Sequence, residues 1–241
     1  MKNKEMKKKM WRFSVGYIIY RGIPVDRLSY FGILEKLNDF ISEVARYFFI
    51  KKYQLRWYHY REFCEQEKNF IFGGFEFNHI SKDKMAGSMI YSDNTVAIGY
   101  NTNMIPSRQN FTQMHEINHA LFDLKHDVPF QNFFDLLKED GYNKEENIQE
   151  VKADIGASLF MISDEALIYS IEKKTSFSDL QDIFEISKMA LEIRLKNFLV
   201  YNLDMYYKNA QVLIEKYKFF NDTREIQARI EIYKEAFDVK I

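Results

Sequence analysis

The stretch RQNFTQMHEINHALFD, residues 108–123, constrains the fold more than any other part of the chain. It places His115 and His119 four residues apart, in a chain that has only five histidines. On an α-helix, side chains four residues apart lie one above the other on the same face. Pro106 just before the stretch suits a helix start, where the first amides have no partners. We therefore predict a helix over 107–123 that presents both imidazoles to one point.

Two imidazoles arranged in this way can each give one nitrogen to a zinc ion, at about 2.0–2.1 Å. Glu116 follows His115 directly and lies about a quarter turn round the helix. From there its carboxylate can reach a water molecule held on the metal and take a proton from it. The spacing of His115, Glu116 and His119 therefore predicts a metal site with a general base beside it.

The residues around this motif are apolar on nearly every side of the helix, which indicates that the helix is buried. Buried histidines and glutamates require partners, because an unsatisfied polar group is costly inside a protein. A metal ion would satisfy them. The alternative is a helix whose two histidines form hydrogen bonds with other groups.

A catalytic zinc needs a third protein ligand and one open position. His126 follows His119 by seven residues, one more than the extended three-histidine pattern has, and Phe122 stands where that pattern has glycine. Glu145 and Glu146 lie in a predicted loop. Glu150 lies on a helix that we predict over 147–162, and Asp154 follows it one turn later. Glu150 could bind the metal while Asp154 accepts a hydrogen bond from a ligand histidine. A solvated helix face explains these two acids equally well.

The composition is that of one large globular domain, or of a main domain with a small companion. The chain has 241 residues, of which 46% are hydrophobic and 29% charged, and its net charge is −1. The charge gives no basic field for nucleic acid or anionic lipid. A single cysteine, Cys64, excludes an internal disulfide and fits a reducing compartment. No apolar run is long enough to span a membrane. We expect a cytoplasmic protein that does not bind membranes.

Hydrophobic periodicity and turn residues predict the other elements. We expect helices over 28–49, around 130–139, over 147–162 with Ser163 capping the next helix, in two short pieces over 176–199 with a break at 185–187, and over 205–239; we expect a strand over 53–60 and a pair of strands flanking Asp93–Asn94.

Three stretches, taken in order, resemble the ImmA/IrrE metallopeptidases over roughly residues 30 to 200. The first, RQNFTQMHEINHALF, matches that family at Arg108, Phe111, Thr112 and the three motif residues. The second, QEVKADIGASLFM, matches at Glu150, Ala153, Ala157, Leu159 or Phe160, and Met161. The third, residues 176–198, is similar to the small helix-turn-helix-like segment that follows the zinc domain of the family.

The resemblance implies a zincin-like α+β fold with a small antiparallel sheet. We divide the chain into a basic tail and lead-in over 1–25, a metallopeptidase domain over 26–174, and a helix-turn-helix-like segment with C-terminal helices over 175–241. It implies Zn²⁺ held by His115, His119 and Glu150, with Glu116 as the base. It also implies that the substrate is a protein, namely a co-encoded transcriptional repressor of a mobile element or stress response.

This chain departs from the family in places, and two other functions stay open. Ile162 and Ser163 stand where the family has proline, and the aromatic N-terminus and the end after 205 are unmatched. The chain could be a regulator that keeps a structural zinc site, or a helix-turn-helix DNA-binding protein. The segment 176–198 has three cationic and four acidic residues. This balance disfavours direct DNA binding and favours packing or substrate docking.

Overall fold

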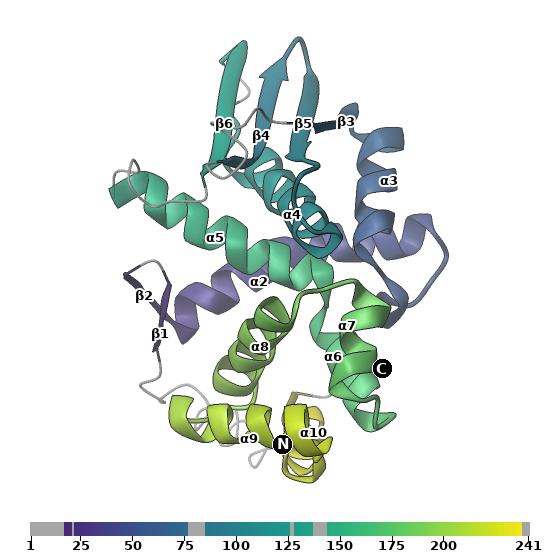
Figure 1. The fold of residues 1–241 in the computed structure, drawn as a ribbon, viewed down its shortest axis with the longest axis vertical. Coiled ribbons are helices and arrows are strands. Elements are labelled where there is room, and N and C mark those ends of the chain that lie inside the picture. The colour runs from purple at the N-terminus through teal and green to yellow at the C-terminus, as the bar shows by residue number, and fades with distance from the viewer. Residues whose placement is uncertain (1–16, 21, 77–84, 126–127, 137–143, 238–241) are drawn as a thin grey trace.

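The computed structural model describes residues 17–20, 22–76, 85–125, 128–136 and 144–237. The lysine-rich tail and His126 lie outside the described residues. Among the helices within those ranges, none combines the length and the apolar character needed to cross a bilayer. The described chain forms a mixed α+β structure, with a sheet at one end and a group of helices at the other (Figure 1).

The larger sheet has four strands in the order β3-β5-β4-β6, and it is mixed rather than antiparallel. β4 pairs antiparallel with both β5 and β6, whereas β3 and β5 are parallel. The prediction of an antiparallel sheet was therefore wrong for one of three pairings, because a strand pattern does not reveal its neighbour. The strands are β3 (Phe70–Phe75), β4 (Met85–Ser92), β5 (Thr95–Asn101) and β6 (Phe130–Leu136).

The predicted pair of strands around Asp93–Asn94 is confirmed as the hairpin of β4 and β5. Both turn residues have positive φ, 52° at Asp93 and 61° at Asn94. Two consecutive residues of this kind form the tight turn whose twist matches that of the flanking strands. Tyr91 donates a hydrogen bond to the Asn94 side chain at 3.0 Å, which supports the same turn.

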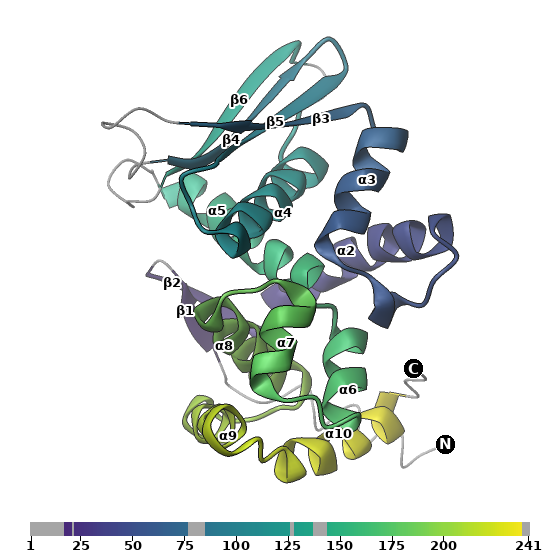
Figure 2. The same ribbon diagram turned by 45° about the vertical axis from the view of Figure 1, so that its right-hand side comes forward.

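One face of the sheet is covered by helix α4, and helices α5 and α2 follow beneath it (Figures 1 and 2). Their apolar faces form a common core, as the predicted three- and four-residue spacing in α2 requires. A short two-stranded sheet packs beside α2. The elements are β1 (Tyr17–Tyr20), β2 (Ile23–Asp26), α2 (Arg27–Tyr47), α3 (Trp57–Glu67), α4 (Pro106–Phe122) and α5 (Lys144–Met161).

The strand predicted over 53–60 is wrong. The chain forms a 3-10 turn at Lys52–Gln54 and then enters α3. The buried residues of α3 are Tyr60, Phe63 and Cys64. Phe63 and Cys64 follow Tyr60 by three and four residues, which places all three on one face of a helix. The aromatic alternation that indicated a strand ran across the boundary between two elements.

The helix predicted around residues 130–139 is also wrong, because residues 130–136 form the edge strand β6; residues 137–139 lie outside the described residues. Its apolar residues recur at helical spacing, but pairing with β4 overrides that local preference. Phe133 lies on the face that points to α4, while Phe130 and Phe134 are exposed.

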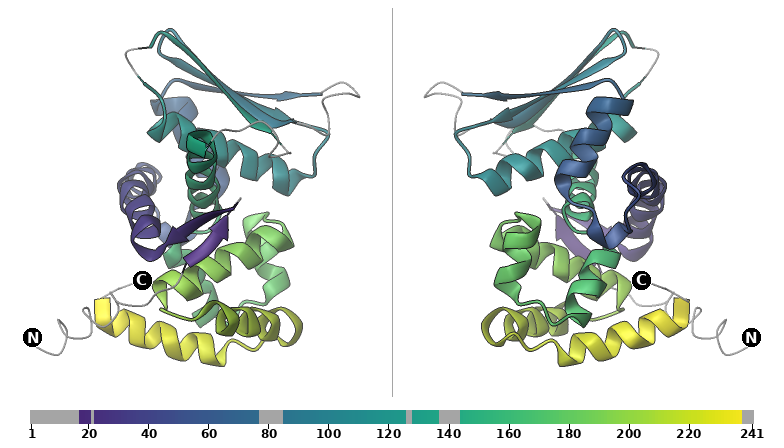
Figure 3. Two further views of the ribbon diagram at one scale, coloured as in Figure 1. Left: turned by 90° about the vertical axis from the view of Figure 1, so that its left-hand side faces the viewer. Right: turned by 90° about the vertical axis from the view of Figure 1, so that its right-hand side faces the viewer.

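The C-terminal part is helical, as predicted, and forms the lower layer in Figure 3. Ser163 and Ser187 each accept a hydrogen bond from a backbone amide and cap the helix that follows. Glu185 has φ 49° and makes the predicted break between two short helices. The elements are α6 (Asp164–Glu172), α7 (Phe177–Phe184), α8 (Lys188–Asn197), a π-helical turn (Phe198–Asn202), α9 (Tyr207–Phe220) and α10 (Arg224–Phe237).

Candidate metal centre

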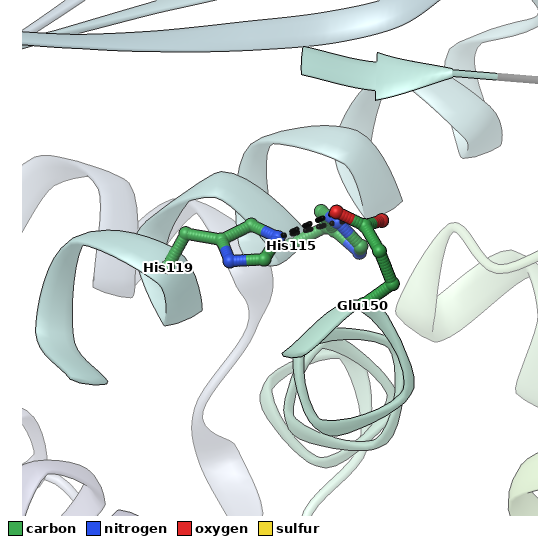
Figure 4. A group of neighbouring side chains, drawn as sticks. All are labelled: His115, His119 and Glu150. Carbon is green, nitrogen blue, oxygen red and sulfur yellow. Dashed lines mark hydrogen bonds and ion pairs between the residues drawn. The ribbon is translucent and has the colours of Figure 1, made fainter. Parts of the chain in front are cut away.

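The structure brings His115 and His119 of α4 together with Glu150 of α5 (Figure 4). The two Nε2 atoms lie 3.1 Å apart. Glu150 Oε2 lies 3.3 Å from Nε2 of His115, and Glu150 Oε1 lies 3.4 Å from Nε2 of His119. All three residues are buried, with exposed fractions of 5% or less. The side chains predicted from sequence therefore meet at one buried point.

The outer nitrogen of each imidazole faces another carboxylate. His115 Nδ1 lies 3.0 Å from Asp154 Oδ1, and His119 Nδ1 lies 2.8 Å from Asp123 Oδ2. A carboxylate accepts hydrogen bonds, so each Nδ1 carries the hydrogen and donates it. When the rings are neutral, this tautomer leaves both Nε2 lone pairs free to bind a cation beside the carboxylate of Glu150.

The two Nε2 atoms and the two carboxylate oxygens of Glu150 are electron-rich, and at this separation they repel one another unless a cation lies among them. A tetrahedral metal with bonds of about 2.0–2.1 Å has ligand atoms about 3.3 Å apart. The distance between the two Nε2 atoms, and the distance from each Nε2 to one of the two Glu150 oxygens, are close to that spacing. The donor set and its geometry thus fit a divalent metal ion held by His115, His119 and Glu150, with the fourth corner left for another ligand.

The local charges also favour a cation. Burial lowers the pKa of His119, but hydrogen bonds to Asp123 and Glu150 outweigh it and raise the pKa to about 9. The charge of Glu116 adds to this upward shift. Burial raises the pKa of Glu150, yet the hydrogen bonds from both histidines hold it well below its usual range. A positive charge, whether proton or metal, is therefore stabilised here.

Glu116 lies between α4 and strand β4, and it is fully buried. A Cβ atom placed on Gly87 of β4 would lie 3.2 Å from Glu116 Oε1 and only 2.3 Å from Thr112 Cγ2. Glycine at this position lets the strand backbone approach the helix beside the carboxylate. Any larger residue would displace Thr112 or the strand, and would disturb Glu116 with them.

Two contacts of the centre were not predicted from sequence. Asp123 holds His119, although it stands four residues after it and thus one helical turn away, which was a usable signal. Phe133 of β6 stacks on His119 with ring centroids 5.3 Å apart. The helix predicted around residues 130–139 does not indicate this contact between Phe133 and His119. Asp154 lies beside His115, which is one of the two placements that the sequence left open.

Comparison with protein families finds one match. A family model of the M78 peptidases, described as the IrrE N-terminal-like domain, matches residues 74–196. This range covers 123 of the 241 residues, just over half, and it includes every residue of the centre. It leaves out α2, α3 and the last two helices. A search among curated proteins found no significant match.

Proposed function

Because this chain belongs to the M78 peptidase family and carries its metallopeptidase domain, we propose that it is a zinc-dependent endopeptidase of zincin-like fold. The observation that carries the proposal is the convergence of His115, His119 and Glu150 at metal-binding distances. Two histidines and one glutamate with an open fourth position form a ligand set of catalytic zinc.

The residues of the chain have distinct roles in this proposal. Zinc, when bound, would lower the pKa of a water molecule and polarise the peptide carbonyl. Glu116 takes the proton of the attacking water and passes it to the leaving amine nitrogen. Asp123 and Asp154 hold the two imidazoles in the tautomer that frees their Nε2 atoms.

For the substrate, we propose an intracellular protein, namely a helix-turn-helix transcriptional repressor encoded beside this chain, and we place the enzyme in the cytoplasm. The proposal is supported by the resemblance to the ImmA/IrrE peptidases, and by the position and surface residues of α7 and α8. Glu185, between those helices, accepts hydrogen bonds from Asn110 of α4 at 3.0 Å and from Trp57 of α3 at 3.3 Å. The helix-turn-helix-like segment is thus tied to the helix that carries the histidines.

The charges of α7 and α8 support docking of a protein rather than of DNA. Arg194 is fully buried, where it pairs with Asp164 and donates to the Ile162 carbonyl at 2.7 Å. It is therefore unable to reach a phosphate. Ile183, Met189 and Ile193 are exposed, at 44%, 71% and 38%. An uncovered apolar group of this kind suits a protein partner.

The proposal is tested by incubating the purified chain, loaded with zinc, with the neighbouring repressor, and by mapping new peptide termini with mass spectrometry. We expect cleavage at one defined bond, its loss on chelation, and its recovery when zinc is restored. Zinc at one ion per chain without cleavage would instead indicate a regulator with a structural site. Salt-sensitive DNA binding would indicate a helix-turn-helix DNA-binding protein.

The two carboxylates behind the histidines are expected to set zinc affinity. Asp123→Asn and Asp154→Asn should each weaken zinc binding about 10- to 100-fold, because the amide orients the imidazole less well and adds no negative charge. Competition with a chelator of known affinity measures this. Asp39→Asn on the exposed side of α2 is the control and should leave the affinity unchanged.

Zinc affinity is expected to rise about tenfold per pH unit between about pH 6.5 and 8.5. The pKa of His119 in the metal-free fold is about 9, so below that pH zinc must displace one proton. Because this pKa is raised on folding, the protonated histidine stabilises the metal-free protein fully below its ordinary pKa, and that contribution is lost as pH rises through 9. Chelator competition and thermal melting across this range check both trends. A flat affinity profile would contradict the assignment.

The exposed apolar residues of α8 are expected to bind substrate. The double variant Met189→Glu/Ile193→Glu should raise KM for the repressor at least about fivefold, because both side chains lose an apolar contact. A short peptide spanning the same scissile bond should be cut at the unchanged rate. Val212→Glu, at an equally exposed position on α9, is the matched control. Equal effects on protein and peptide would rule out docking at α8.

A further inference from the structure

A second feature of the molecule lies on the other side of α4 and α5 from the metal centre. There a cavity of about 460 Å³, partly open to solvent, is lined by β2, α2, the end of α4 and the start of α5 (elements in Figure 1). This volume is in the range of small-molecule sites, about 300–1,000 Å³. It backs onto the centre through Asp123, which lines the cavity while its carboxylate holds His119.

The walls of this cavity are mainly apolar, with Val25, Ile33, Phe122 and Val151 contributed by four different elements. Val25 and Val151 are almost completely buried, at 5% and 3% exposed. Apolar surface from four elements that meet around a space of this size favours an apolar ligand over water.

Two lysines line the same cavity, Lys36 from α2 and Lys152 from α5. Within the described ranges, the structure gives neither ammonium group an ion-pair partner. The one acidic lining residue, Asp123, already accepts the hydrogen bond of His119. The charge left over at the cavity is thus positive, which complements an anion.

Gly32 is an exposed and unobstructed position in the wall of this cavity. It lies within α2 and lines the cavity, and no atom lies within 4 Å of where its Cβ would be. Glycine inside a helix is unfavourable relative to alanine, and nothing in the described structure presses against this position. A larger side chain at this position therefore has open space to occupy.

We propose that this cavity binds a small amphiphile that has a carboxylate head and an unbranched apolar tail. The head lies between Lys36 and Lys152, and the tail lies against Ile33, Phe122 and Val151. The site is independent of the metal and of peptide hydrolysis, so the proposal does not depend on the proposed function.

The test is calorimetric titration of the full chain with hexanoate, octanoate and decanoate below their micelle concentrations. We expect one site per chain and about fourfold tighter binding for each added methylene until the tail fills the cavity. Decanol and decylamine, which have the same tail without a negative charge, should bind at least about fivefold more weakly than decanoate. Binding by decylamine as tight as by decanoate, or no binding of decanoate, would overturn the proposal.

Variants locate the site. Lys36→Gln/Lys152→Gln should weaken decanoate binding at least about fivefold and leave decanol unchanged, whereas Lys208→Gln, an exposed lysine on α9, should change neither. Gly32→Phe should abolish binding because the ring occupies the space, and Gly32→Ala should retain it. Methyl NMR shifts at Ile33 and Val151 on adding decanoate are expected in the unmodified chain. Binding that persists in Gly32→Phe, or shifts confined to other methyl groups, would overturn the assignment.

Discussion

Glu116→Gln is expected to lower kcat/KM for peptide hydrolysis about a thousandfold while the protein still binds one zinc per chain. The amide has nearly the same shape as the carboxylate, so it fits the same buried space between α4 and β4. It cannot accept a proton from water, and general-base catalysis of this kind contributes about 10²- to 10⁴-fold. The metal ligands His115, His119 and Glu150 are unchanged, so zinc content should not fall.

Three measurements make this result interpretable. Zinc content by elemental analysis and the thermal midpoint should match those of the unmodified chain, which separates a catalytic loss from an unfolded or metal-free protein. Glu35→Gln, at an exposed position on α2, should cleave the substrate at the normal rate. If Glu116→Gln still cleaved the repressor at more than about a tenth of the normal rate, Glu116 would not be the base.

The part of the centre that lies on one helix could be predicted from sequence, because helix geometry alone relates its residues. His115 and His119 converge since they are four apart, and Pro106 begins the helix as expected. The same rule applies to Asp123, four residues after His119, although it was not used there. Helical spacing alone thus predicts Asp123 as a partner of His119, in addition to the pair of histidines.

The contribution of α5 could not be derived in this way. Glu150 is 31 residues after His119, and from spacing alone a solvated helix face explained it as well as a ligand did. Only the resemblance to a family favoured the ligand role, and only the packing of α5 on α4 places its carboxylate at 3.3 and 3.4 Å from the imidazoles. Tertiary packing, which no local pattern encodes, decides where this side chain lies.

The errors in secondary structure have the same origin. β6 has apolar residues at helical spacing but pairs as an edge strand with β4. As a strand, β6 brings Phe133 onto the ring of His119, which a helix at 130–139 would not predict. Because β6 was predicted as a helix, the contact of Phe133 with His119 was not predicted either.

Since the spacing of α4 and α5 sets the centre, a residue at which the two helices are in close contact should control metal binding. That residue is Gly156 of α5, which packs against Asn118 of α4. A Cβ at Gly156 would lie 1.9 Å from Asn118 Oδ1 and 2.5 Å from its Cγ. Asn118 is 3% exposed and donates to the Met114 carbonyl at 2.9 Å, so its amide is held in place.

We therefore expect Gly156→Ala to lower the free energy of unfolding by about 1–3 kcal/mol, as overpacking does. Zinc affinity should fall at least about tenfold, because separating the helices moves Glu150 away from both imidazoles. Gly32→Ala makes the same substitution within a helix where no atom lies within 4 Å, and it should instead raise the free energy of unfolding by about 0.5–1 kcal/mol. Denaturant titration and chelator competition on both variants measure the contrast.

A double variant shows whether the contact itself is responsible. Asn118 also lines the cavity behind the centre, so its amide has a second direction in which to move. If the Asn118 amide turns into the cavity in the Gly156→Ala variant, the free energy of unfolding changes little, although the hydrogen bond to Met114 is lost. Zinc affinity is therefore measured as well as stability. Asn118→Ala removes the obstructing amide, so adding Gly156→Ala to it should cost at least about 1 kcal/mol less than in the unmodified chain. Additive effects, or a Gly156→Ala variant with normal stability and normal zinc affinity, would mean that this contact does not set the distance between the two helices that hold the metal.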